Sequence, residues 1–456
     1  MNMKQTFTLK EKIAQLWHLF LPILITQLAM LLMNFFDTTM SGHFSKADLA
    51  GVAIGASLWF PVSTGLGTVL QAVTPIISHL IGSKNTDEIP RTFIQSLYVA
   101  VCMAVLVLFA GGLSIGPVLG RMDLAPHVER VAHRFLFALS FGLIPLFCYQ
   151  VCRSLIDATG LTKISMLITL LALPINIGLN VLFIFGHAGF PQLGGAGAGV
   201  ASAITYWLIL LIAILVLMRL PRFAEMRLFR TFYPVSFRSW KALLSLGIPM
   251  GLSTFFESSI FSVVTLFMSK FGTDTIASHQ AAMNFESLLY MLPLSISLAM
   301  TILVSFEAGA GRFKDARLYS TIGLITAVVI ATLTGLLLYL FHEQVAAFYS
   351  DDPAVIRLTG HFLLYAIFFQ WSDAVQAPVQ GALRGYKDVR ITTIMTFVSY
   401  WVIGLPLGYL LDAVTALGPF AYWIGLITGL AVGAVTLLGR LHYIQQKARD
   451  LLKKNG

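Results

Sequence analysis

The chain has 456 residues, of which 57% are hydrophobic and only 11% are charged. Soluble domains carry roughly 25% charged residues, so this composition excludes a protein whose whole surface faces water. The net charge of +9 does not indicate a nucleic-acid partner, because the basic residues lie in short segments between apolar stretches rather than on one face or in a tail.

Twelve stretches are apolar and long enough to cross a membrane, since a crossing helix needs about 20 mainly apolar residues. The second stretch is long enough to include a kink, for which Pro61 and Pro75 are the expected places. The sequence therefore predicts an all-α membrane protein with no cleaved export signal. In chain order the predicted spans are 16–40, 49–81, 92–120, 132–156, 164–186, 194–218, 242–269, 275–304, 317–341, 356–382, 391–411 and 417–439.

The orientation of the spans follows from the distribution of Lys and Arg. If the N-terminus is inside the cell, 24 of the 30 basic residues fall in cytoplasmic segments, as the positive-inside rule requires. We therefore expect a multi-pass protein of the cell inner (plasma) membrane with both termini in the cytoplasm. The longest connection, 219–241, is strongly basic and is expected to lie on anionic membrane lipid.

The two halves of the chain resemble each other at an offset of about 227 residues. Pro22 in the first span matches Pro249 in the seventh, and the charged turn at 84–87 matches the one at 312–315. Since each half has six spans, both halves begin on the same side of the membrane. This predicts two six-helix lobes related by a pseudo-two-fold axis along the membrane normal, with a site between them. The expected parts are an N-terminal lobe (1–218), a linker (219–241) and a C-terminal lobe with a basic tail (242–456).

Four acidic residues lie inside predicted spans, namely Asp37, Glu257, Glu286 and Asp373. Each would cost about 2.5–3.5 kcal/mol at the middle of a bilayer, so each is expected to face a cavity or to be protonated. We expect no Lys or Arg deep enough in a span to neutralise them. Such an uncompensated acidic interior favours an organic cation, a proton, or both as the transported species.

Polar residues accompany these acids at helical spacing. The tenth span carries a stripe of Gln370, Asp373, Gln376 and Gln380, and the fifth carries a pair one turn apart, Asn176 and Asn180. Such side chains could also form hydrogen bonds between helices and have no role other than to hold the bundle together. For the carboxylates a functional role is favoured, because acids inside a membrane are costly and are retained for transport or proton transfer.

The sequence contains none of the motifs of zinc proteases, phosphate-binding loops or serine hydrolases. We therefore expect neither an enzyme nor a cofactor-dependent protein. An ATP-driven pump is disfavoured for the same reason, which leaves a gradient of Na⁺ or H⁺ as the expected energy source.

Several stretches in a particular order resemble the multidrug and toxic compound extrusion family, and within it the NorM-like branch. They are NFFDTTMSG at 34–42, NIGLN at 176–180, GFPQLGG at 189–195, FE at 256–257, HQAA at 279–282, Asp373, and ALRG at 382–385. The resemblance covers nearly the whole chain. It implies a V-shaped pair of six-helix lobes that exports drugs in exchange for a cation.

The resemblance also implies roles for individual residues. Glu257 and Asp373 would form the coupling-cation site, which is a Na⁺ site if the protein is sodium-coupled. Asp37, Asn176 and Asn180 would form a polar site in the N-terminal lobe. Glu286 departs from the family pattern, but it lies one turn from Tyr290 and could add charge to a drug site. The expected drug contacts are Ser57, Gln280, Glu286, Tyr290, Asp351 and Asp352, although Asp351-Asp352-Pro353 also reads as a helix N-cap.

Three rival functions remain open. A lipid-linked oligosaccharide flippase of the same superfamily would need a basic cavity. A major facilitator transporter would carry a Gly-rich loop with Asp and Arg after the second span, which 82–91 does not contain. An intramembrane enzyme would need a catalytic motif. We therefore expect a monomeric secondary active antiporter that exports cationic drugs or dyes.

Overall fold

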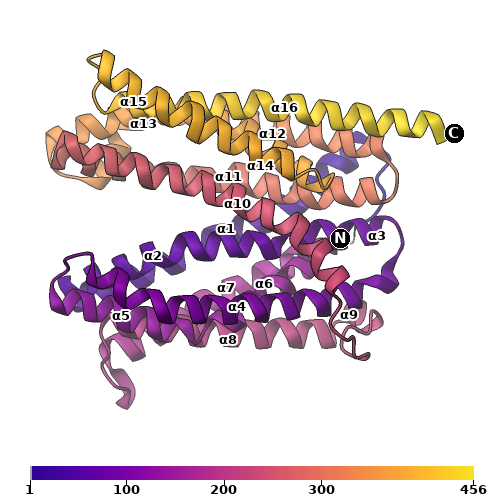
Figure 1. Cartoon of the computed structure of the whole chain (residues 1–456), viewed down its shortest axis with the longest axis horizontal. Helices are drawn as coiled ribbons and strands as arrows, with labels where there is room; N and C mark the ends of the chain where they lie inside the picture. The colour runs from indigo at the N-terminus through magenta and orange to yellow at the C-terminus, as the bar shows by residue number, and fades with distance from the viewer. Residues whose placement is uncertain (1–2, 456) are drawn as a thin grey trace. The chain divides into compact units, whose positions relative to one another are not determined.

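The computed structural model describes the backbone of residues 3–455 and the side chains of residues 3–450. This part of the chain is built from long helices joined by short loops, and it contains no β-strand (Figure 1). In chain order the helices are α1 (Leu9–Phe44), α2 (Lys46–Gln71), α3 (Val73–Gly82), α4 (Ile89–Gly120), α5 (Pro126–Ser140), α6 (Leu143–Ala158), α7 (Thr162–Phe185), α8 (Gly195–Arg219), α9 (Pro221–Glu225), α10 (Phe237–Met268), α11 (Thr273–Gly309), α12 (Phe313–Tyr349), α13 (Pro353–Gly385), α14 (Arg390–Phe397), the π-helix η4 (Val398–Gly404), α15 (Leu405–Val414) and α16 (Phe420–Asn455). Three short 3₁₀ turns complete them, η1 (Thr86–Glu88), η2 (His187–Gly189) and η3 (Ser269–Phe271).

The prediction of an all-α membrane protein is confirmed. Within residues 3–455, 11 helical segments are long and apolar enough to cross a membrane, or 12 if the bent pair α5 and α6 is one span. Each predicted span coincides with one of these segments. The fourth predicted span, 132–156, differs because its two helices meet at an angle of 51°.

Prolines explain both breaks within spans. Helix α2 ends at Gln71, four residues before Pro75, and α5 gives way to α6 at Phe141, four residues before Pro145. A proline has no N–H for the carbonyl four residues earlier, and its ring crowds that carbonyl. Pro75 is therefore the predicted kink, whereas Pro61 lies inside an uninterrupted α2.

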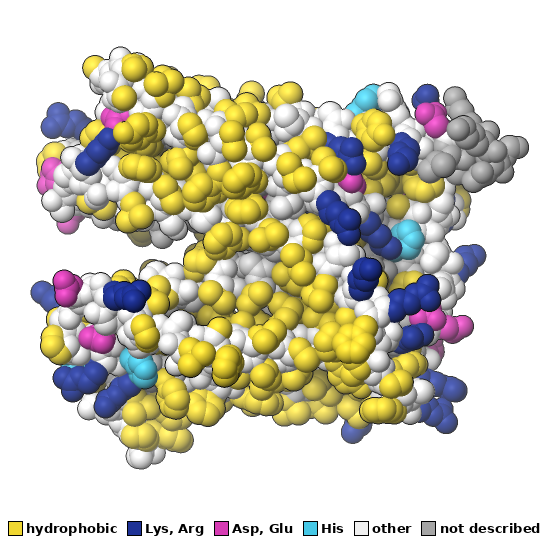
Figure 2. All heavy atoms as spheres, in the orientation of Figure 1, with side chains coloured by type: hydrophobic (Ala, Val, Ile, Leu, Met, Phe, Trp, Pro, Cys, Tyr) yellow, Lys and Arg dark blue, Asp and Glu magenta, His cyan; other side chains and the backbone are white. Residues whose placement is uncertain are grey.

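The outer side chains along the middle of the helices are mostly hydrophobic, and charged side chains gather near the helix ends (Figure 2). Large apolar residues such as Leu106, Phe109 and Leu333 are more than half exposed. In water this would be a severe cost, but in lipid it is the expected surface of a spanning helix.

The chain divides into two compact units. The N-terminal unit holds Ile25–Gly251 together with Met3, and the C-terminal unit holds Lys4–Leu24 and Leu252–Gly456. This division differs from the predicted boundaries, because α1 and α10 each contribute residues to both units. In each of these helices the change of unit falls three residues after a proline, at Pro22 and at Pro249.

Specific contacts explain why the first part of α1 belongs to the C-terminal unit and the first part of α10 to the N-terminal unit. In the C-terminal unit, Lys12 Nζ lies 2.9 Å from an Asp315 carboxylate oxygen, and the Thr6 and Tyr319 hydroxyls are 2.8 Å apart. In the N-terminal unit, α10 packs so closely on α2 that a Cβ at Gly247 would lie 2.5 Å from the Val69 carbonyl oxygen. The start of each of these helices is therefore fixed by contacts within one unit.

Helix α13 is the centre of the C-terminal unit and packs against α11, α12 and α16. Its contact with α11 requires a glycine, because a Cβ at Gly381 would lie 2.3 Å from the Ser297 carbonyl oxygen. The Thr301 hydroxyl donates to the Gly381 carbonyl at 3.0 Å across the same contact. This close approach sets which residues of α13 face the interior of the unit.

In the N-terminal unit, α8 packs against α5, α6 and α7. Small residues make this possible, since a Cβ at Gly197 would lie 2.4 Å from the Phe183 carbonyl oxygen and one at Gly199 would lie 2.5 Å from the Phe135 carbonyl oxygen. Small residues at helix interfaces allow close approach of backbones in membrane bundles. The same packing brings Ser202 of α8 next to α7.

The eleventh span contains the seven-residue π-helix η4. It packs against α16, where a Cβ at Gly425 would lie 2.5 Å from the Gly404 carbonyl oxygen. Tyr400 in this π-helix accepts a hydrogen bond from Gln376 at 3.1 Å, and the Trp401 indole donates to the Phe256 carbonyl at 3.1 Å. The π-helix thus positions two aromatic residues toward α13 and α10.

Candidate transport site

The polar site of the N-terminal unit is centred on Asp37 of α1. Asn180 of α7 donates to one carboxylate oxygen at 2.7 Å, and the Ser202 hydroxyl of α8 donates to the other at 2.8 Å. Asn180 also donates to Asn176 at 3.3 Å. All four side chains are buried, so Asp37 has a hydrogen-bond donor for each carboxylate oxygen.

The helical spacing predicted the asparagine pair, and the family resemblance implied its place beside Asp37. Asn176 and Asn180 lie one turn apart on α7, and the structure brings them together with Asp37 as expected. Ser202 was not predicted, because a serine among the small residues of α8 carries no signal of its own. Its position next to Asp37 depends on the close packing of α7 and α8.

The polar stripe of α13 faces the interior of the C-terminal unit. Gln370, Asp373, Gln376 and Gln380 are all buried, which agrees with the predicted helical face. Their amides have different partners: Gln370 donates to Thr334 at 2.8 Å, Gln376 donates to Tyr400, and Gln380 donates to a Glu257 carboxylate oxygen. Glu257 of α10 is thereby joined to α13.

The expectation that no Lys or Arg lies deep enough in a span to neutralise the acids was wrong for Glu257. Arg384, two residues beyond the predicted end of the tenth span, is still helical, only 8% exposed, and attracts Glu257 electrostatically. Arg153 lies inside the predicted fourth span, is 4% exposed, and approaches the Asp157 carboxylate at 3.4 Å. Each buried arginine therefore has an acidic partner, and Glu257 is partly compensated.

Glu286 of α11 is in a different position from Glu257. It is 2% exposed, and in the part of the chain that the structure describes neither of its carboxylate oxygens has a hydrogen-bond partner. It interacts electrostatically with Asp373 of α13, which is 7% exposed. These two carboxylates are therefore the least compensated acids of the C-terminal unit.

The predicted drug contacts differ in how exposed their side chains are. Ser57 of α2 is exposed, and its hydroxyl donates to the Ile54 carbonyl at 2.8 Å. In the C-terminal unit Gln280 is exposed and Tyr290 is half-buried. Glu286, which was predicted to contact drug, is buried instead.

Asp351 and Asp352 are exposed and lie immediately before α13. Asp352 accepts a hydrogen bond from the Ala354 backbone N–H at 2.8 Å, and Pro353 is the first residue of the helix. This is the N-cap that the sequence also predicted. The Ser278 hydroxyl donates to the Val355 carbonyl at 3.3 Å, so α11 and α13 begin side by side at the same end of the unit.

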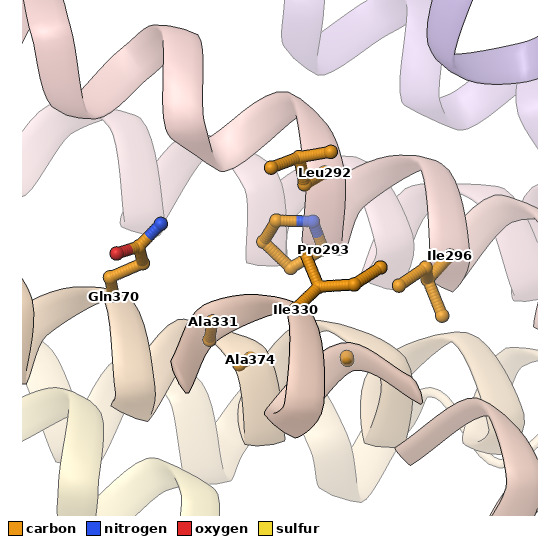
Figure 3. A pocket seen from close by; sticks show the side chains of 8 residues that line it. Leu292, Pro293, Ile296, Ile330, Ala331, Gln370 and Ala374 are labelled. Carbon is orange, nitrogen blue, oxygen red and sulfur yellow. The ribbon is translucent and has the colours of Figure 1, made fainter. Parts of the chain in front are cut away.

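A small cavity of about 10 Å³ lies between α11, α12 and α13 (Figure 3). Pro293 and three alanines leave this space, which is close to the minimum that one water molecule needs. The amide of Gln370 is the polar group that lines it, and the Gln370 carbonyl oxygen has no hydrogen-bond partner among the described residues. The lining residues are Leu292, Pro293, Ile296, Ala327, Ile330, Ala331, Gln370 and Ala374.

Among residues 3–450, no three His, Cys, Asp or Glu side chains lie close enough to hold a metal ion together. A cation at Glu257 or Asp373 would therefore need amide or hydroxyl oxygens as further ligands. The stripe of glutamines on α13 offers such oxygens, because the Gln370 and Gln376 carbonyl oxygens are both buried without a partner among the described residues.

Solved structures share this fold over almost the whole chain. The crystal structure of MATE in complex with MaL6 covers 96% of this chain and 97% of its own, with a TM-score of 0.88 and 18% sequence identity. The crystal structure of a eukaryotic MATE transporter covers 97% and 99%, with a TM-score of 0.84 and 20% identity.

Closer relatives are found by sequence. The chain is 55% identical over 445 residues to the "Probable multidrug resistance protein NorM" of Bacillus subtilis (strain 168), covering 98% of both chains. It is 50% identical over 446 residues to the protein of the same name from Oceanobacillus iheyensis, covering 98% of this chain and 100% of the relative.

The MatE family model matches the chain twice, at residues 22–182 and 249–410. The two matches begin 227 residues apart, which is the offset of the internal repeat. Together they cover more than half of the chain, and the relatives match it from end to end. This chain therefore belongs to the MatE family, the multidrug and toxic compound extrusion transporters that its sequence resembles.

Proposed function

We propose that this protein is a secondary active antiporter that exports lipophilic organic cations in exchange for Na⁺ or H⁺. The observation that carries the proposal is the buried acidic cluster of the C-terminal unit, where Asp373 and Glu286 exceed the basic charge available. The relatives named multidrug resistance proteins support drugs as the substrate class. A surplus of buried negative charge fits a cationic ligand and a coupling cation.

The proposed coupling-cation site contains Glu257 and Asp373. Asp37 with Asn176 and Asn180 forms a second polar site, which responds to the same cation or holds α1 in place. Ser57, Gln280, Asp351 and Asp352 are exposed and Tyr290 is half-buried, and these residues remain the proposed drug contacts. Cation–π contacts would suit flat cationic dyes at such aromatic positions.

The coupling ion and the drug are proposed to oppose each other. A monovalent cation between the carboxylates relieves their repulsion and favours one arrangement of α10 and α13, whereas a bulky organic cation favours another. A ligand shifts such a balance only by its differential affinity for the two states. By linkage each ligand weakens the other, and about 1–3 kcal/mol of coupling corresponds to a 5–150-fold change in affinity.

The proposed location is the plasma membrane, with both termini in the cytoplasm and the basic linker 219–241 on anionic lipid. The proposed active form is a monomer. Cysteine labelling from each side of the membrane at positions in 219–241 would test the orientation.

The decisive experiment is efflux of ethidium from inverted vesicles with a Na⁺ gradient and a pH gradient imposed separately. Transport driven by one or both gradients is expected. Dye affinity should also fall as Na⁺ is titrated at two fixed pH values. An affinity that responds to neither Na⁺ nor pH would contradict coupled antiport, and a response to pH alone would identify a proton antiporter.

A flippase for lipid-linked oligosaccharides is the second candidate, because Arg153 and Arg384 are buried basic side chains. Each of them is matched by an acid, Asp157 and Glu257 respectively. Neither arginine therefore creates the basic cavity that a polyanionic head group needs. Binding of a cationic dye in detergent, with no competition from a pyrophosphate-linked lipid, would exclude the flippase.

A further inference from the structure

Glu286 lies in an environment that a permanently charged carboxylate cannot tolerate. It is 2% exposed, and neither carboxylate oxygen has a hydrogen-bond partner within residues 3–450. A buried ionised group without partners costs many kcal/mol and is retained only if it is neutralised. The neutralising group must be a cation that the protein binds, because the nearby side chains do not supply one.

The charged groups around Glu286 and Asp373 offer no free positive charge, because the nearby arginine is already paired with another acid. On α13, Arg384 interacts with Glu257 of α10, which leaves Asp373 as the unpaired acid. Tyr290 on α11 and Tyr400 in the π-helix interact electrostatically with Glu257 and Asp373, and a tyrosine cannot carry positive charge.

His279, two turns before Glu286 on α11, is also not a counter-charge. Its Nδ1 accepts a hydrogen bond from the Trp423 indole N–H at 3.0 Å, so this nitrogen carries no proton. The other ring nitrogen, Nε2, lies 3.0 Å from the Thr265 hydroxyl. The hydrogen bonds therefore hold His279 in its neutral form.

Two negative charges remain when the pairs are removed, one on Asp373 and one on Glu286. Uncharged oxygen ligands are available on the same face of α13, since the Gln370 and Gln376 carbonyl oxygens are buried and have no partner among the described residues. Hard cations such as Na⁺ prefer oxygen ligands of this kind. The small cavity beside Gln370 (Figure 3) lies one turn of α13 from Asp373.

We propose that Glu286 is a second cation-binding carboxylate, so that the C-terminal unit takes up two monovalent cations, Na⁺ or H⁺, in each transport cycle. One cation compensates Asp373 and the other compensates Glu286. Exchange of two such cations for one singly charged drug moves one positive charge across the membrane. This inference rests on the proposed function and adds the ion-to-drug ratio to it.

The ratio is measured with purified protein in proteoliposomes, with ethidium as the drug and the membrane potential clamped at zero. The Na⁺ and H⁺ gradients are imposed in turn, and at equilibrium the logarithm of the ethidium ratio is plotted against the logarithm of each ion ratio. The two slopes should sum to about two, because two ions exchange for each dye molecule. In Glu286→Gln the summed slope should fall to about one. Electrogenic current during transport should disappear in the same variant.

Two variants control for indirect effects. Glu286→Asp keeps the carboxylate and should keep the steeper slope, and Ser287→Ala changes the exposed neighbour on α11 and should behave as the wild type. Folding is checked by size-exclusion chromatography and thermal unfolding. If Glu286→Gln does not fold, the slope of the wild type and its current still decide the ratio.

A summed slope near one in the wild type, or a summed slope that Glu286→Gln leaves unchanged, would overturn the second cation site while leaving coupled export intact. A wild type that builds no ethidium gradient with either ion would instead overturn the proposed function, and with it this inference. The two failures are therefore distinguished by the wild-type measurement alone.

Discussion

The two units make the same helix contact at equivalent positions but place their charges on different helices there. At the offset of 227 residues, Glu257 and Gln380 of the C-terminal unit correspond to Met30 and Arg153 of the N-terminal unit. Both pairs are in contact, since Gln380 donates to Glu257 and Arg153 donates to the Met30 sulfur at 3.3 Å. The same contact between two helices is therefore kept with different chemistry.

The comparison extends to the next helical turn. Asp157, which pairs with Arg153, corresponds to Arg384, which interacts with Glu257. Each unit thus retains one buried acid and one buried base around this contact, with the roles exchanged. Of the four acids inside the predicted spans, those outside these compensated groups are Asp37 in one unit and Asp373 with Glu286 in the other.

These remaining acids also differ in their hydrogen bonds. Both oxygens of Asp37 accept a hydrogen bond, whereas Glu286 accepts none among the described residues. A satisfied carboxylate can hold helices together, but an unsatisfied one must gain a ligand. The comparison supports our proposal that the C-terminal site exchanges ions, and it favours a mainly positioning role for the N-terminal site.

The largest effect is expected for Asp373→Asn, which keeps the size of the side chain and removes its charge. Coupled efflux should be lost while the protein still folds, because removal of an uncompensated buried charge does not cost stability. Ethidium efflux is measured at equal expression, with thermal unfolding in detergent as the check on folding. Efflux at the wild-type rate would remove Asp373 from the coupling site.

The next effect is expected in the compensated group of the N-terminal unit. Asp157→Asn leaves Arg153 buried without its ion pair and should lower the free energy of unfolding by about 3–5 kcal/mol. The double variant Arg153→Gln with Asp157→Asn removes both charges and should recover most of this loss. Thermal unfolding of the wild type, the single variant and the double variant measures the change in stability. A double variant as unstable as Asp157→Asn would show that the loss of the charge pair is not the cause.

The smallest effect tests the positioning role of Asn180. Asn180→Ala removes a donor from Asp37 and should lower the free energy of unfolding by about 1–3 kcal/mol. Asn34→Ala, on the exposed face of α1, is the matched control and should change it by less than about 0.5 kcal/mol. Equal stability of the two variants would mean that the hydrogen bond to Asp37 does not stabilise the unit.

The fold was largely predictable from the sequence because lipid imposes a simple requirement. A spanning segment must satisfy its own backbone hydrogen bonds and present apolar side chains outward, so length and hydropathy identify it. The bend between α5 and α6 was missed, since Pro145 lies well inside an apolar stretch and the break falls four residues earlier.

The acids of the site were predictable because an acidic residue in an apolar stretch is conspicuous. Their partners were not, since Arg384 reaches Glu257 from a helix more than a hundred residues away and Ser202 reaches Asp37 only through the packing of α8. Helical spacing identifies neighbours on one helix, whereas compensation between helices depends on tertiary contacts. The burial of Glu286 could not be predicted for the same reason, because it also depends on contacts between helices.

The π-helix η4 has a consequence for which lengths of the eleventh span the fold accepts. A π-helix accommodates one more residue than an α-helical turn. Deleting one residue from η4 could therefore restore an α-helical turn while the helix beyond it keeps nearly its present rotation. Gly408 would still face Gly425, which approaches it closely. A one-residue deletion in α15 itself has no such compensation and would rotate the residues beyond it by about 100°. Alignments of relatives should therefore place a one-residue gap within 398–404 rather than elsewhere in this span.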